Sequence, residues 1–299
     1  MSNIAKDNTL KNRKCRVSDV LLMAAIYIAA ALSVTLLAGI IGYVFYKGFG
    51  MLSAEFFTST PSVLKGTVGI AGNLVNTLYI VLITLFIATP IGVGSAIYLN
   101  EYAGTGKLVK IIEFTTETLS GIPSVIFGLF GMVFFGNTFG LSYSILTGAL
   151  TLSLMVLPLI TRNTQEALRT VPLSYRSGAL GMGATKWYMI RTILLPSAMP
   201  GIVTGIILAL GRIIGESAAL LFTAGSGYDL IRLGSNLGGN LEKIADKTLR
   251  SGGTLTVQLY LYMSKGEYDA AFAIGCVLLV IAFLLNILTK FVARSFRRA

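Results

Sequence analysis

Residues 20–46 read VLLMAAIYIAAALSVTLLAGIIGYVFY and carry no charged side chain. A membrane-spanning α-helix needs about 20 consecutive, mostly apolar residues, so this stretch is long enough to cross a bilayer. Basic residues precede it, as at the start of a secretory signal peptide, but the apolar part of such a signal is only about 7–15 residues long. We therefore expect an uncleaved membrane anchor.

Further apolar stretches of spanning length follow along the chain. They cover about residues 76–99, 119–135, 141–160, 193–222 and 270–292. Pro123 falls in the first turn of the 119–135 stretch, where a helix tolerates proline. Only 12% of the residues are charged, against about 25% in a soluble domain. The expected fold is an all-α, polytopic membrane protein with six spans and no β-sheet.

Lysine and arginine are distributed unevenly around these spans. With the N-terminus inside, the inner segments hold most of them, which by the positive-inside rule places both termini in the cytoplasm. The expected organisation is a tail at 1–18, a transmembrane domain at 19–292 and a tail at 293–299. The net charge of +11 is explained by orientation in the membrane, because the charges flank apolar stretches. We therefore expect no nucleic-acid partner.

Two connections between the spans are long. The inner loop at about 162–192 mixes charged residues with apolar ones at helical spacing, which predicts short amphipathic helices on the cytoplasmic side. The outer loop at about 223–269 is rich in glycine. This composition predicts an irregular or partly re-entrant segment.

Arg212 and Glu216 form the only charge pair placed deep in a predicted span. They are four residues apart, so on a helix they would share one face. An arginine at the middle of a membrane helix costs about 2.5–3.5 kcal/mol, so the pair should face the protein interior or an aqueous path. It could be a structural ion pair or part of a translocation path for an oxyanion. Arg162 ends the 141–160 span and by position alone is an interfacial arginine.

The chain lacks the residue patterns of an enzyme or a metal site. It has no histidine, and its two cysteines are Cys15 in the basic tail and Cys276 in an apolar run. We therefore expect no catalytic residue, metal or cofactor. Residues 104–107 (GTGK) lack the preceding glycine and the following Ser or Thr of a phosphate-binding loop. Any nucleotide must therefore be bound by another chain.

The inner loop carries a spaced motif. Residues 177–183 read SGALGMG, and after nine further residues 193–196 read ILLP. This resembles the signature of ABC importer permeases, which is Glu-Ala-Ala, three residues, Gly, nine residues, Ile-x-Leu-Pro. Ser177 and Gly178 depart from the opening Glu and Ala, which removes any contact that needs a carboxylate there.

The resemblance implies a role for this loop. A short helix that ends at glycine and is turned back toward the membrane at a proline break would dock into a groove of the ATPase subunit. Its small residues would form the docking surface, and its motion would report ATP binding to the spans. The residues implied in this coupling are Ser177, Gly178, Ala179, Gly183, Ile193, Leu195 and Pro196.

Other stretches resemble the phosphate importers in particular. Residues 121–131, 170–172 and 183–187 are similar to that group. Residues 212–225 (RIIGESAALLFTAG), 255–260 and 285–286 resemble the A-type permease of the phosphate-specific transport (Pst) system. In that family, membrane arginines and a glutamate are tied to phosphate translocation. The matching positions here are Arg212, Glu216 and, less directly, Arg162.

The resemblance also implies partners and a location. These are a homologous second permease in a heterodimer, two ATP-binding subunits on the cytoplasmic side, and an extracytoplasmic phosphate-binding protein that docks on loops such as 223–269. The location would be the bacterial plasma (inner) membrane. The alternatives are a permease for sulfate or molybdate, a non-transporting membrane scaffold or sensor, and a self-contained carrier, for which the 177–196 loop would be dispensable.

Overall fold

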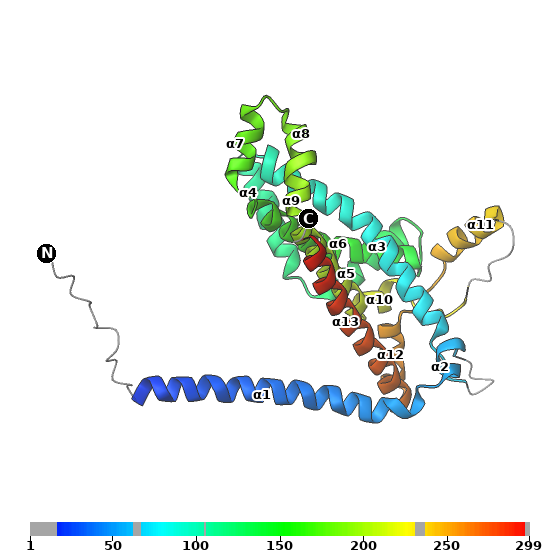
Figure 1. Cartoon of the computed structure of the whole chain (residues 1–299). Helices are drawn as coiled ribbons and strands as arrows, with labels where there is room; N and C mark the ends of the chain where they lie inside the picture. Colours follow the sequence, from blue (N-terminus) through cyan, green and yellow to red (C-terminus); the bar gives the residue numbers. More distant parts are fainter. Residues whose placement is uncertain (1–16, 62–66, 105, 231–236, 297–299) are drawn as a thin grey trace. The chain divides into compact units, whose positions relative to one another are not determined.

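The computed structural model describes residues 17–61, 67–104, 106–230 and 237–296, without the side chains at 17, 108, 237–241 and 292–296. Residues 1–16 and 297–299 of the predicted tails, and 231–236 of the outer loop, lie outside the described residues. The described elements are all helical, as predicted (Figure 1). They are α1 (Val17–Gly48), α2 (Ala54–Thr58), α3 (Ala71–Ile97), α4 (Lys107–Ser120), α5 (Ser124–Gly131), α6 (Ile145–Arg169), α7 (Leu173–Gly181), α8 (Lys186–Met189), α9 (Leu195–Gly215), α10 (Ala218–Thr223), α11 (Leu237–Thr248), α12 (Leu255–Ser264) and α13 (Tyr268–Phe296), with a 3-10 turn η1 (Phe49–Met51) and the π-helical turns η2 (Tyr98–Tyr102), η3 (Met132–Thr138) and η4 (Ile190–Leu194).

The membrane fold is confirmed. Within the described chain, five helical stretches are long and apolar enough to cross a bilayer. They are Ser18–Met51, Ala71–Tyr102, Ile145–Arg169, Lys186–Gly215 and Tyr268–Phe291. A sixth is present if a bent helix pair counts as one span. The first of these stretches, in α1, has an exposed apolar surface along its length, which suits contact with lipid.

The stretch 119–135, predicted as one span, is not one continuous helix. It crosses a bend of 103° between Val109–Ser120 and Ser124–Thr138. Pro123 lies before the first residue of α5 instead of in the first turn of a longer helix. The reason is local, because a proline disfavours helical backbone in the residue before it, and α4 ends at Ser120, three residues upstream.

The predicted span at 193–222 is interrupted. Helix α9 ends at Gly215, and α10 begins at Ala218. Glu216 has extended backbone dihedral angles, and its Oε1 accepts a hydrogen bond from the backbone N–H of Ala219 at 3.1 Å. A carboxylate that satisfies a free N–H at a helix start favours a new helix over continuation of the old one. Arg212 and Glu216 therefore do not share a helix face, and that prediction is wrong.

The outer loop contains both irregular and helical parts. Its glycines permit tight turns, as at Gly225, which has a φ of +76°. It also contains α11 and the largely buried α12, which the prediction of an irregular segment did not include. Lys247 of α11 is 5% exposed and donates to the carbonyl oxygen of Asp229 at 2.7 Å. Burial lowers the pKa of Lys247.

Helices α3, α6 and α9 pack against one another and carry much of the main core. Small residues bring the backbones close together. A Cβ atom added at Gly92 would lie 2.8 Å from Cγ2 of Ile160, which is fully buried and stiff because its side chain is β-branched. Gly94 lies two residues further along the same helix. A Cβ atom added there would have no neighbouring atom within 4 Å.

This pair of glycines gives a prediction of opposite signs on one helix. Gly92→Ala should lower the free energy of unfolding by about 1–3 kcal/mol, because overpacking forces the core to shift. Gly94→Ala should leave it unchanged or raise it by up to about 1 kcal/mol, because alanine is the better helix former. Thermal unfolding of the detergent-solubilised protein measures both. Equal shifts in Tm would contradict the packing described.

Candidate translocation cavity and coupling hairpin

A cavity of about 490 Å³ lies between α4, α6 and α9. Half of its lining residues are charged, and these comprise three arginines and three glutamates. These are Arg162, Arg169, Arg212, Glu113, Glu117 and Glu166. The cavity therefore combines equal numbers of opposite charges.

Helix periodicity places these residues. On α6, Arg162, Glu166 and Arg169 follow one another at spacings of four and three, which puts them on one helix face. On α4, Glu113 and Glu117 are four apart on the polar side of an amphipathic helix. Because α6 runs on to Arg169, Arg162 lies inside a helix and not at its end as predicted.

Two of the three arginines have carboxylate partners. Arg162 lies 3.5 Å from Glu166 (Nε to Oε1) and 3.9 Å from Glu117 (Nη1 to Oε1). Arg169 Nη2 lies 3.6 Å from Glu113 Oε1. All these side chains are substantially exposed, so the pairs are loose, and such pairs contribute only about 0–1 kcal/mol. A competing anion could therefore displace a carboxylate at small cost.

Arg212 is the arginine without a partner. It lines the cavity from the last turn of α9, and among the described residues no carboxylate lies within ion-pairing distance of it. Glu216 does not line the cavity, since its carboxylate binds the start of α10. The sequence thus identified Arg212 and Arg162 in the cavity but assigned Arg212 the wrong counter-charge.

Sequence reasoning missed the other cavity residues. Arg169, Glu166 and Gln165 follow Arg162 at helical spacing, a signal that the sequence did contain. Gln165 is 9% exposed and lines the cavity, and its Nε2 has no hydrogen-bond partner within the described structure. An unused buried N–H donor costs free energy.

The predicted coupling loop is a helical hairpin. Helices α7 and α8 lie side by side at one end of the bundle, and α2 and α12 lie toward the opposite end (Figure 1). Gly183, in the turn between α7 and α8, has a φ of +83°, which favours glycine. The outer surface of the hairpin is rich in exposed large apolar side chains, namely Leu173, Tyr175, Leu180, Met182, Trp187 and Tyr188. We call these six residues the hairpin surface.

The predicted coupling residues divide into two groups. Ser177, Gly178, Gly183 and Pro196 are exposed. Ala179 is buried at 8% exposure, in a cluster to which Ile193 and Leu195 also pack, so these three side chains hold the hairpin to the spans. The expectation that Ala179 belongs to the docking surface is therefore wrong.

The expected break at Pro196 is also absent. The helix continues from Lys186 to Gly215. Pro196 is the second residue of α9, which directly follows the π-helical turn η4. Proline lacks a backbone N–H and clashes with the carbonyl of the preceding turn. The wider π turn accommodates this without ending the helix, since π-bulges change the hydrogen-bonding register.

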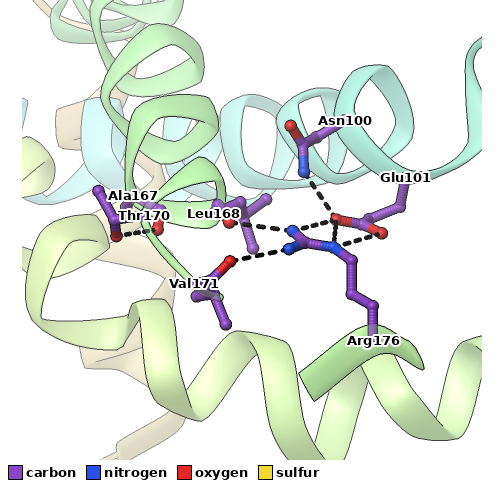
Figure 2. Close-up of polar contacts among 7 residues, drawn as sticks. All are labelled: Asn100, Glu101, Ala167, Leu168, Thr170, Val171 and Arg176. Carbon is purple, nitrogen blue, oxygen red and sulfur yellow. Dashed lines mark hydrogen bonds and ion pairs between the residues drawn. The ribbon is translucent and has the colours of Figure 1, made fainter. Parts of the chain in front are cut away.

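One buried ion pair joins the hairpin to the spans (Figure 2). Arg176 of α7 binds Glu101 of η2 at 2.8 Å (Nη2 to Oε1), and Asn100 also donates to that Oε1 at 2.6 Å. The same guanidinium donates to the carbonyl oxygens of Leu168 and Val171, both at 3.0 Å. The side chains are 17% and 5% exposed for Arg176 and Glu101. Sequence reasoning missed this pair, although an acidic residue directly after an apolar span was a visible signal.

The energetics of this pair differ from those of the cavity pairs. Removing one partner of a buried ion pair costs about 3–5 kcal/mol, because the other charge is left uncompensated. Arg176 has several charge-assisted hydrogen bonds, which offset its desolvation. The contact is therefore a firm connection between α7, η2 and the end of α6.

The described structure combines apolar spans, a helical hairpin at one end of the bundle and a charged cavity. The chain belongs to the family described as binding-protein-dependent transport system inner membrane component, whose model matches residues 88–298. It is a permease subunit of an ABC importer, a membrane component that is not itself catalytic, and ATP hydrolysis belongs to a separate subunit.

Several relatives support this assignment. The chain is 40% identical over 214 residues to the probable ABC transporter permease protein YqgI of Bacillus subtilis, covering 72% of each chain. It is 36% identical over 207 residues to the phosphate transport system permease protein PstA of Xylella fastidiosa, covering 66% of this chain and 71% of that one. A bacterial alginate ABC transporter shares the fold, with a TM-score of 0.61 and 16% identity over 93% of this chain and 94% of that one. The methionine ABC transporter MetNI gives a TM-score of 0.57 and 22% identity over 76% and 94%.

Proposed function

We propose that this chain is the permease subunit that carries inorganic phosphate through an ATP-driven importer in the bacterial inner membrane. The observation that carries the proposal is the cavity with one unpaired guanidinium, Arg212, and two loosely paired ones. Guanidiniums offer a fork of donors that matches the oxygens of a phosphate. The similarity to PstA proteins supports phosphate among the oxyanions.

The carboxylates of the cavity favour phosphate over sulfate on chemical grounds. Phosphate keeps a proton near neutral pH, so it can donate a hydrogen bond, whereas sulfate has only acceptor oxygens. Glu117 and Glu166 lie beside Arg162 and as carboxylates are acceptors only. They would accept a hydrogen bond from the P–OH group and repel an oxyanion that has no such group. The balance of charges also keeps the site from trapping the ion, which must leave again.

The proposal also covers the orientation of the chain and its partners. Both termini and the α7–α8 hairpin lie in the cytoplasm, where the hairpin surface docks on one of two ATP-binding subunits. A second, homologous permease completes the membrane unit as a heterodimer. An extracytoplasmic phosphate-binding protein docks on the outer loop at the opposite end of the bundle.

The test is ATP-dependent uptake of radiolabelled phosphate in cells with and without this chain, in a strain that lacks other phosphate importers. We expect uptake to be lost without the chain and restored by its expression. An excess of unlabelled phosphate should compete, whereas sulfate and molybdate should not. Uptake that persists without the chain, or that sulfate abolishes, would contradict the phosphate assignment.

Glu117→Gln tests the proposed selectivity. The substitution removes a negative charge and turns an acceptor into a group that also donates, so sulfate should become a competitor. We expect the ratio of the sulfate inhibition constant to the phosphate inhibition constant to fall about tenfold, which corresponds to about 1.4 kcal/mol. The matched control is Glu242→Gln on α11, outside the cavity lining. An unchanged ratio in the Glu117→Gln variant would show that Glu117 does not distinguish a protonated oxyanion from an unprotonated one.

A further inference from the structure

We propose that α3, held at both of its ends by polar contacts, is the element that transmits movement between the ATPase-facing hairpin and the outer loop. The inference rests on family membership and on the proposed orientation, and it does not depend on which ion is carried. Its positioning residues are Arg176 and Glu101 at the inner end and Tyr79 at the outer end.

The inner end of α3 is held by both helices of the hairpin. The helix continues directly into η2, whose Glu101 is bound by Arg176 of α7 (Figure 2). Tyr102 of the same turn lies under Lys186 of α8, with Nζ 4.9 Å from the ring centroid, which is a cation–π contact. A displacement of the hairpin therefore pulls on η2 through two independent contacts.

The identity of the guanidinium matters for this connection. Arg176 joins its own helix α7 to the end of α6 and to η2, since it bonds the Leu168 and Val171 carbonyls as well as Glu101. An ammonium group is a point charge with no planar fork and cannot reproduce this geometry. The three segments can move together only while the fork is in place.

The outer end of α3 is bonded to the outer loop. Asn73 and Asn76 donate from Nδ2 to the carbonyl oxygens of Gly253 (3.0 Å) and Gly227 (2.9 Å), respectively. Thr77 Oγ1 accepts from the backbone N–H of Leu255 at 3.0 Å, which fixes the start of α12.

Tyr79 extends these contacts to α11. Its hydroxyl donates to the carbonyl oxygen of Ile244 and pairs with the Thr248 hydroxyl, both at 3.0 Å. Between its ends, α3 passes Pro90 as one helix and packs along α6. A single helix thus connects the two ends of the bundle, and each end is fixed by directional bonds.

Spatial connection alone does not establish coupling, so the test measures transmission directly. The reporter is Leu249→Cys, an exposed position just after α11, in a chain with Cys15→Ala and Cys276→Ala. The complete complex, purified with its ATPase subunits, is labelled with a water-soluble maleimide with and without a non-hydrolysable ATP analogue. The labelling rate reports the state of the outer loop without reference to any transported ion.

We expect the nucleotide to change the labelling rate in the parent, and Arg176→Lys to reduce that change at least fivefold. Tyr79→Phe removes one hydroxyl at the far end of α3 and should reduce the change in the same way. Combining the two should give no further reduction, because both act on one connection. Arg191→Lys is the matched control, since Arg191 is exposed and no ion pair of it occurs among the described residues.

Basal ATP hydrolysis by the same complexes distinguishes lost coupling from lost assembly, and it should stay near the parent rate in every variant. If Arg176→Lys prevents assembly, Tyr79→Phe decides the question, since it keeps the ring and lies far from the hairpin. A parent that shows no nucleotide-dependent change, or a Tyr79→Phe variant with the full change, would overturn the proposal. Failure of phosphate uptake alone would leave it standing.

Discussion

Arg212→Gln should lower phosphate uptake by about 10- to 100-fold at equal membrane abundance. The cavity would lose its unpaired guanidinium, and a hydrogen bond to a charged group is worth about 1.5–3 kcal/mol. Arg212→Lys keeps the charge but not the planar fork, so we expect an intermediate loss. Initial rates of radiolabelled phosphate uptake, normalised to the amount of the chain in the membrane, measure both.

Glu216→Gln tests whether Arg212 acts in the cavity without Glu216 or as part of the Arg212–Glu216 pair that the sequence suggested. The amide Oε1 of glutamine can still accept from the backbone N–H of Ala219, the contact that Glu216 makes here, so uptake should stay within about twofold of the parent, well under 1 kcal/mol. A loss as large as that of Arg212→Gln would show instead that the two residues act as a pair. Normal uptake by the Arg212→Gln variant would show that phosphate does not pass through this cavity.

Met182→Glu should abolish co-purification of the ATPase subunit. Met182 is 91% exposed at the tip of the hairpin surface, with Leu180 at 50% beside it. If this surface is buried in the partner, the new carboxylate is buried without a counter-charge, and interface changes of this kind cost about 2–4 kcal/mol or more. That corresponds to binding weaker by about 30-fold to 1,000-fold.

The control for this substitution is Met263→Glu, an exposed methionine at the end of α12. It introduces the same charge at the opposite end of the bundle and should leave ATPase association unchanged. The measurement is the ratio of ATPase subunit to permease after affinity purification through the permease. Full recovery of the ATPase with Met182→Glu would place the docking surface elsewhere.

The amino-acid sequence alone determined the class of fold and the place of the hairpin. Apolar runs such as 20–46 and 270–292 specify membrane helices, because a helix satisfies its backbone hydrogen bonds within one segment in lipid. The stretch from Ser177 to Pro196 indicated the hairpin, since it encodes short helices and their turn within one local stretch. The sequence also singled out Arg212 as a candidate site residue, because a charge within an apolar run costs free energy in the membrane.

The tertiary structure decided which charges meet. The break after Gly215 depends on competition between continuing α9 and capping α10, and the Glu216 side chain settled it. The cavity carboxylates come from α4 and α6, and the Glu101–Arg176 pair joins residues 75 positions apart. Periodicity gives the face on which a side chain lies but not the helix that this face meets. That depends on the angle of a bend, such as the 103° turn before α5, and on close packing at small residues such as Gly92.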